Sequence, residues 1–137
     1  MSYDYSENIL VQKSTGNLLR DELGWDVRFA YNTEVLGKGG TLGRTSYKEI
    51  LLLRYFREAL KKFNPWISEN QIIEAQNLLE KRLSTSSLLQ INEEKYFLLR
   101  DGIPVTVKKP DGQAETKKAT VIDFQNPDNN YFLAIKE

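Results

Sequence analysis

Apolar residues recur every three or four positions along four stretches of the chain, and this is the period of a helix that packs one face against a core. In the stretch before Asn64, for example, Ile50, Leu53, Phe56, Leu60 and Phe63 form one stripe. The spacing predicts helices over residues 7–23, 46–63, 68–83 and 87–100.

Polar and special residues mark where these helices begin and end. Ser6 precedes Glu7 as a helix cap, and the segments 46–49 and 68–71 both have the serine and Glu/Gln spacing of a capping box. Gly24 suits the left-handed position that follows a helix, and the pair Asn64-Pro65 stops the second helix.

Strict alternation of apolar and polar residues predicts the strands. It occurs over residues 25–31 and 103–107, and the turn Pro110-Asp111-Gly112 then leads into a returning strand at 116–123. A polar turn at 126–130 separates Val121–Asp123 from the apolar run 131–135, so we expect strand, turn and strand there. The order of elements predicts the α+β class, with helices packed on a small, mainly antiparallel sheet.

Composition narrows the chemistry. With 137 residues, 40% hydrophobic and 28% charged, the chain has the make-up of one globular domain. It has neither cysteine nor histidine, which argues against zinc sites of the usual kind and against thiol or imidazole catalysis, and leaves a hard cation such as Mg²⁺ on carboxylates as the metal to expect. No apolar run has membrane-spanning length, so a cytoplasmic protein is the default.

A glycine-rich segment, GKGGTLGR at residues 37–44, lies in the loop after the first predicted strand. Its glycines, with Lys38 near a helix start, suit a phosphate cradle, and Lys38 and Arg44 suit nonspecific contact with a DNA backbone. It lacks the Gly-Lys-Ser/Thr triplet of a P-loop, and a flexible connection explains it equally well.

The predicted hairpin contains letters that imitate a nuclease motif. Pro110-Asp111 followed by Glu115-Thr116-Lys117 reads as PD…ExK, in which two acids bind Mg²⁺ and the lysine acts on the attacking water. Only three residues separate Asp111 from Glu115, and the acids of a hairpin tip point into solvent without a supporting shell. We therefore expect the match to be accidental.

Two other carboxylates have a functional and a structural interpretation. Asp123 is placed to ligate a metal, or to accept hydrogen bonds from the N–H groups of the turn that follows. Glu7 is placed to be a metal ligand borne by a helix, or an acid that stabilises the helix dipole from the first turn.

Three long stretches of the chain, in order, resemble one protein family: YSENILVQKSTGNLLRDELGWDV, GTLGRTSYKEILLLRYFREALKKFNP and VIDFQNPDNNYFLA. The resemblance is to the N-terminal region of the restriction (R) subunit of type I restriction-modification enzymes, and it covers nearly all of the sequence. Its most specific parts are Ser6-Glu7-Asn8, Leu23-Gly24-Trp25, Asn64-Pro65, Ile122-Asp123-Phe124, Asn126-Pro127 and Asn129-Asn130.

The resemblance implies a PD-(D/E)xK nuclease domain with a restriction-endonuclease-like fold, of which residues 1–137 would be the N-terminal part. The family's DNA cleavage requires Mg²⁺, and an ATP-driven translocase and separate methylation and specificity subunits accompany it. The family's catalytic Pro-Asp and Glu-x-Lys follow the segment that matches 131–135, so we expect the chain to be a fragment, inactive alone. Of the family's site residues only Glu7 has a match, as a helix acid that assists catalysis at the metal site.

A non-catalytic module that binds DNA or docks a partner subunit is the alternative. On the second predicted helix, Arg54, Arg57 and Lys61 recur at steps of three and four residues and therefore share a face, and Lys48 and Lys62 lie nearby. The same pattern is also that of an ordinary solvated helix face.

Overall fold

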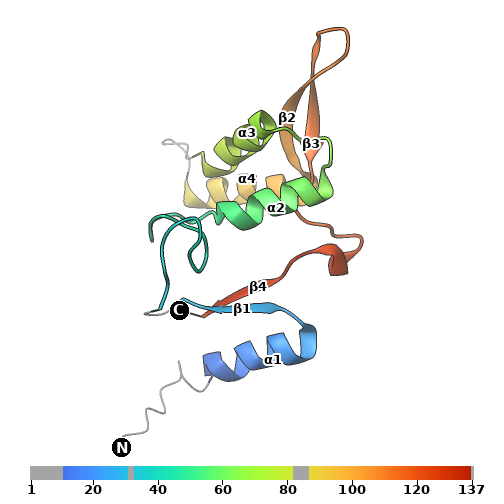
Figure 1. Cartoon of the computed structure of the whole chain (residues 1–137). Helices are drawn as coiled ribbons and strands as arrows, with labels where there is room; N and C mark the ends of the chain where they lie inside the picture. Colours follow the sequence, from blue (N-terminus) through green and yellow to red (C-terminus); the bar gives the residue numbers. More distant parts are fainter. Residues whose placement is uncertain (1–10, 31–32, 82–86, 137) are drawn as a thin grey trace, which may run out of the picture. The chain divides into compact units, whose positions relative to one another are not determined.

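The computed structural model describes residues 11–30, 33–81 and 87–136 (Figure 1). It contains helices and small sheets, which confirms the α+β class. The chain divides into two compact units: the described residues within Met1–Arg54 and Tyr131–Glu137, and those within Tyr55–Asn130. In the described part of the chain no helix has the length and apolar character needed to cross a membrane.

The first unit is built on a parallel pair of strands. Helix α1 (Lys13–Leu23) leads into β1 (Asp26–Phe29), and β1 pairs in parallel with β4 (Leu133–Lys136). As predicted, α1 is followed by Gly24 in the left-handed conformation (φ 69°), and the Gly24 N–H donates to the Arg20 carbonyl oxygen at 3.1 Å. The Trp25 and Phe132 rings stack at 4.9 Å between centroids, next to the start of the paired strands.

The second unit holds most of α2 (Leu53–Phe63), together with α3 (Glu69–Glu80), α4 (Leu88–Asp101) and a hairpin of β2 (Ile103–Lys108) and β3 (Ala114–Ala119). A short 3₁₀ turn at Pro127–Asn129 follows. Its core consists of fully or almost fully buried apolar side chains from α2, α3 and the base of the hairpin: Phe56, Leu60, Ile72, Ala75, Leu79, Ile103, Val105 and Ala119.

Several local predictions for this unit are confirmed. Ser68 and Gln71 form a capping box at the start of α3, and Ser87 caps α4 in the same way through Gln90. Helix α2 ends at Phe63, directly before Asn64-Pro65. The turn Pro110-Asp111-Gly112 lies between β2 and β3.

The prediction that a helix begins at Ser46 is wrong. Glu49 does not return to the Ser46 N–H as a capping box requires, but accepts hydrogen bonds from the Thr45 backbone N–H (3.1 Å) and the Thr45 hydroxyl (2.5 Å). The Lys48 N–H donates to the Ser46 hydroxyl oxygen at 3.1 Å. These polar groups satisfy one another in a turn, and α2 begins only at Leu53.

The strand–turn–strand prediction for residues 121–135 is also wrong in its first part. The returning strand is Ala114–Ala119, and residues 121–124 are not in a strand. The last strand is β4, and its described partner is β1, about a hundred residues earlier in the sequence. The structure therefore has one antiparallel and one parallel two-stranded sheet instead of a single, mainly antiparallel one.

Candidate functional site in the glycine-rich loop

The glycine-rich loop folds back on itself through its own backbone. The Gly37 N–H donates to the Arg44 carbonyl oxygen (2.8 Å), and the Gly40 N–H donates to the Gly37 carbonyl oxygen (2.9 Å). Thr41 and Val35 exchange two bonds, from the Thr41 N–H to the Val35 carbonyl and from the Val35 N–H to the Thr41 hydroxyl, both at 2.9 Å. These N–H groups donate within the loop, so they do not form the phosphate cradle that the sequence suggested.

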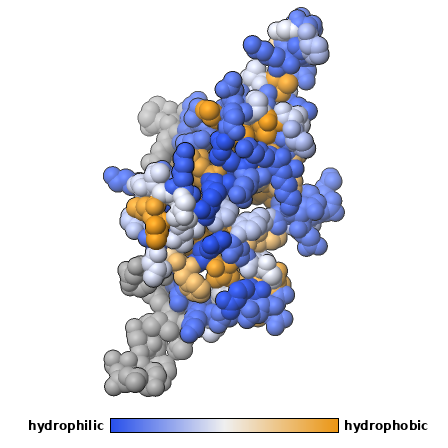
Figure 2. Space-filling view, in the orientation of Figure 1, coloured by the Kyte–Doolittle hydropathy of each residue, from blue (hydrophilic) through white to orange (hydrophobic). Residues whose placement is uncertain are grey.

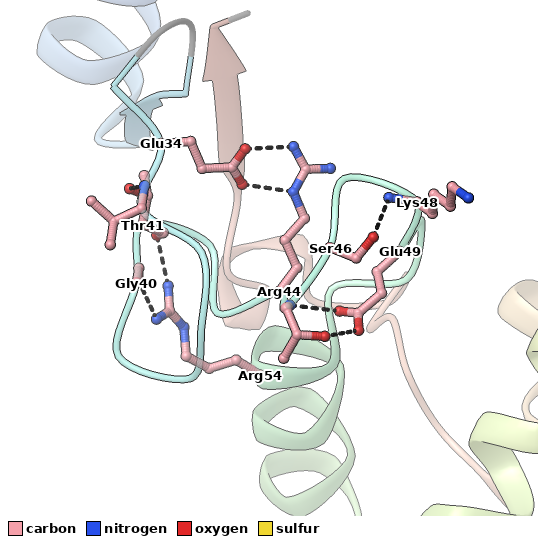
Figure 3. Close-up of polar contacts among 10 residues, drawn as sticks. Glu34, Gly40, Thr41, Arg44, Ser46, Lys48, Glu49 and Arg54 are labelled. Carbon is pink, nitrogen blue, oxygen red and sulfur yellow. Dashed lines mark hydrogen bonds and ion pairs between the residues drawn. The ribbon is translucent and has the colours of Figure 1, made fainter.

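An ion pair joins the two ends of the loop. The Arg44 guanidinium donates to both carboxylate oxygens of Glu34, at 2.6 and 2.7 Å (Figure 3). The Glu34 side chain is only 3% exposed and that of Arg44 15%. The hydrogen bonds from Arg44 lower the pKa of Glu34 from its ordinary value. A two-point guanidinium–carboxylate pair fixes orientation as well as distance, so it holds the loop in one shape.

A second arginine binds the middle of the loop. Arg54, in the first turn of α2, donates to the carbonyl oxygens of Gly40 (2.9 Å) and Thr41 (2.8 Å) (Figure 3). Its side chain also lies against Gly43, whose φ is 76°. The sequence analysis placed Arg54 on a basic helix face, but the structure assigns it to the loop.

The two predicted DNA contacts of the loop have different surroundings. Lys38 is exposed, directly after Gly37, whose φ is 107°. Arg44 is mostly covered, paired with Glu34, with its guanidinium carbon 5.4 Å from the centroid of the Tyr47 ring. DNA contact by these two residues stays a prediction, and the structure adds that Arg44 has a structural role in the loop.

The basic face proposed for the second helix is largely neutralised. Arg57 donates to the Glu69 carboxylate at 2.5 Å, and the Lys61 ammonium lies 3.5 Å from the same group. Lys62 donates to the Asn129 carbonyl oxygen. Lys48 precedes the helix, so these cations do not form the continuous stripe that the docking alternative required.

The PD…ExK letters of the hairpin do not form a site. Asp111 accepts a hydrogen bond from the Gln113 N–H (2.9 Å), and Glu115 pairs with Lys109 (3.2 Å). The Lys117 ammonium lies over the Trp66 ring, 4.3 Å from its centroid. The three side chains have three different partners, so the match is accidental, as expected.

Asp123 acts as the organiser of a turn. One of its carboxylate oxygens accepts from the N–H groups of Asn126 (2.9 Å) and Gln125 (3.1 Å), and the other accepts from the Asn129 side-chain amide (3.1 Å). These bonds, led by that from Asn126, lower the pKa of Asp123. Of the two interpretations given above, the structural one accounts for all of these contacts.

The lowered pKa predicts a pH-dependent contribution from Asp123. A carboxyl group whose pKa is lower when folded stabilises the fold above its unfolded pKa, about 3.9, and loses that contribution as the pH falls through the folded value. We expect Asp123→Asn to lower the urea midpoint at pH 7, and the difference from the wild type to narrow below about pH 4. Urea titrations followed by circular dichroism at both pH values test this; a difference independent of pH would contradict it.

Glu7, the predicted helix acid of a metal site, lies outside the described residues. Within the three described ranges no group of three or more acidic, cysteine or histidine side chains comes together in a way that could hold a metal ion. The described residues therefore do not fit a Mg²⁺ site, and a role of Glu7 in catalysis or metal binding stays a prediction.

Comparison with known proteins gives a consistent result. Residues 4–137 match the family model of the type I restriction enzyme R protein N terminus. The chain is 26% identical over 132 residues to the type I restriction enzyme HindI endonuclease subunit of Haemophilus influenzae, covering 96% of this chain and 12% of that protein.

A second relative comes from an archaeon. The putative type I restriction enzyme MjaIXP endonuclease subunit of Methanocaldococcus jannaschii is 26% identical over 94 residues, covering 69% of this chain and 9% of that protein. The chain thus spans about a tenth of the length of these relatives. No solved structure matches it significantly.

Proposed function

Because the chain belongs to the family of type I restriction enzyme R protein N termini, we propose that it forms the first part of the DNA-cleaving subunit of such an enzyme. The observation that carries the proposal is the family match over residues 4–137. Two relatives that share this region are named as endonuclease subunits.

The proposal extends to the parent enzyme. Its substrate is double-stranded DNA, its cleavage requires Mg²⁺, and its movement along DNA uses ATP. Its partners are a methylation subunit and a specificity subunit that recognises the DNA sequence. The described residues do not fit a metal site, so we assign them no step in phosphodiester cleavage, and the chain alone is expected not to cut DNA.

We propose a scaffolding role for the first unit. Parallel sheets are normally covered on both faces and gain stability from several strands, whereas β1 and β4 form a sheet of two. Phe29 and Ile135, on these strands, are 45% and 38% exposed. Such a pair suits the start of a larger sheet in a restriction-endonuclease-like nuclease domain.

A restriction assay in the organism that encodes the chain tests the proposal. Codons 4–137 are deleted in frame, and unmodified and modified plasmids are introduced in parallel. We expect the deletion to raise transformation by unmodified plasmid to the level of modified plasmid, because cleavage is lost. Methylation of resident DNA should persist, since another subunit supplies it. Unchanged exclusion of unmodified plasmid would overturn the proposal.

A further inference from the structure

Lysine is concentrated in the outer part of the β2–β3 hairpin. Residues 108–118 contain Lys108, Lys109, Lys117 and Lys118 but only two acidic residues, whereas the formal charge of the whole chain is zero. The four lysines are all exposed. The hairpin is therefore a local excess of positive charge on a chain that has none overall.

The strand register separates these lysines into two pairs. Lys109 is paired with Glu115, and Lys117 lies over Trp66. Lys108 stands opposite Ala114, and Lys118 opposite Pro104, so alternation places Lys108 and Lys118 on the same face of the hairpin. Four residues of ladder separate them, or roughly 14 Å at about 3.4 Å per residue.

The hairpin is held firmly at its base. Ile103, Val105 and Ala119 are buried. On the edge of β2 that faces away from β3, Glu74 of α3 accepts from the Thr106 N–H (3.0 Å) and hydroxyl (2.9 Å), and Gln71 donates to the Thr106 carbonyl oxygen (3.2 Å). The lysine-bearing outer part is therefore an extension of a fixed base.

The outer part of the hairpin is open to solvent. Residues 114–118 of β3 are all exposed, so β3 contributes only Ala119 to the core. Within the second unit the hairpin extends past α3, and its outer end is mostly hydrophilic (Figures 1 and 2). A strand that packs so little apolar surface is well placed to contact another molecule.

We propose that this hairpin is a DNA-contacting arm in which Lys108 and Lys118 bind backbone phosphates of duplex DNA. The inference rests on the proposed function for its partner. Duplex DNA carries one negative charge per about 1.7 Å of its axis, so two ammonium groups roughly 14 Å apart both find phosphates. The major groove, about 12 Å wide, admits a two-stranded ribbon.

The chemistry of β3 favours DNA over a protein partner. The centres of protein interfaces are enriched in aromatic residues and depleted in lysine and glutamate. The exposed run Glu115, Thr116, Lys117 and Lys118 has the opposite character, and threonine hydroxyls are themselves common phosphate ligands. Lysines also protect exposed strands from unwanted pairing, a role that does not require DNA.

Fluorescence anisotropy of a labelled 30-base-pair duplex with the full chain tests the arm. The double variant Lys108→Gln/Lys118→Gln is compared with Lys13→Gln/Lys81→Gln, which removes equal charge from exposed positions elsewhere. Each lost phosphate contact reduces the salt slope by about 0.9, so between 50 and 200 mM salt the wild type should lose roughly tenfold more affinity than the hairpin variant. The control variant should keep the wild-type slope.

The variant Lys108→Arg/Lys118→Arg, which keeps the charge, should bind as the wild type does, and thermal unfolding checks that all variants fold. Equal binding by the hairpin variant and the wild type, or no binding by the wild type at 50 mM salt, would overturn the inference. Normal DNA binding together with loss of a co-purifying protein would assign the hairpin to protein docking instead. None of these outcomes bears on the restriction assay, so the two proposals fail separately.

Discussion

Replacing Asn64 with alanine is expected to lower the free energy of unfolding by roughly 2–4 kcal/mol, because three hydrogen bonds worth about 1 kcal/mol each are lost. The Asn64 side-chain amide donates to the carbonyl oxygens of Leu60 (2.9 Å) and Thr120 (2.7 Å), and its oxygen accepts from the Thr120 N–H (2.9 Å). Asn64 is 2% exposed. It thus ties the end of α2 to the segment that follows β3. Urea denaturation measures the loss.

Two variants sharpen this test. Asn64→Asp keeps an acceptor for the Thr120 N–H but sets a carboxylate against two carbonyl oxygens, so it should destabilise at least as much as alanine at pH 7 and less in acid, where the carboxyl group can donate. Asn92→Ala makes the alanine change at an exposed position of α4 and should alter stability by only a few tenths of a kcal/mol. Similar losses at Asn64 and Asn92 would contradict the assigned role.

The double role of Asn64 also shows what the sequence reveals and what it hides. The pair Asn64-Pro65 predicts the end of a helix, because the residue before proline is disfavoured in helical conformation. The bonds to Thr120 join residues 56 positions apart, and no local pattern announces them. Gly24, the Ser68 capping box and the turn at 110–112 were likewise predictable because each signal lies within a few residues.

The predictions that failed are those in which a local pattern had more than one solution. The serine and glutamate of a capping box are present at 46–49, but Thr45 supplies a competing donor for Glu49. The alternation at 121–123 resembles a strand, yet no described strand pairs with it. Parallel pairing of β1 with β4 depends on contacts about a hundred residues apart, and apolar periodicity cannot specify which strand is the partner.

The candidate site was located by sequence but not understood from it. Clustered glycines mark the loop at 37–44, and Lys38 was singled out correctly as an exposed cation. Glu34 and Arg54 were missed as members of the loop because they lie outside the glycine run, and their roles depend on how the loop folds back. A charged residue before the loop and an arginine after it give no signal until the loop's shape is known.

Within this loop, Gly40→Ala should be far more damaging than the same change one residue earlier. A Cβ at Gly40 would lie 1.9 Å from the Val35 carbonyl oxygen and 3.0 Å from that of Gly37, so backbone must move. Overpacking of this kind costs roughly 1–3 kcal/mol, occasionally more. At Gly39 a Cβ meets nothing within 4 Å, and alanine there should be neutral or stabilise by about 0.4–1 kcal/mol through the unfolded state.

Hydrogen exchange separates a local effect from a global one. The Thr41 N–H donates to the Val35 carbonyl that the new methyl group would displace, and the Arg54 guanidinium binds the carbonyls of Gly40 and Thr41. Gly40→Ala should therefore accelerate exchange at Thr41 while amides in α3 stay protected, and Gly39→Ala should leave both unchanged. Equal exchange at Thr41 in the two variants would mean that these hydrogen bonds do not hold the loop. Lys38 would then lack the fixed platform that a dependable phosphate contact requires.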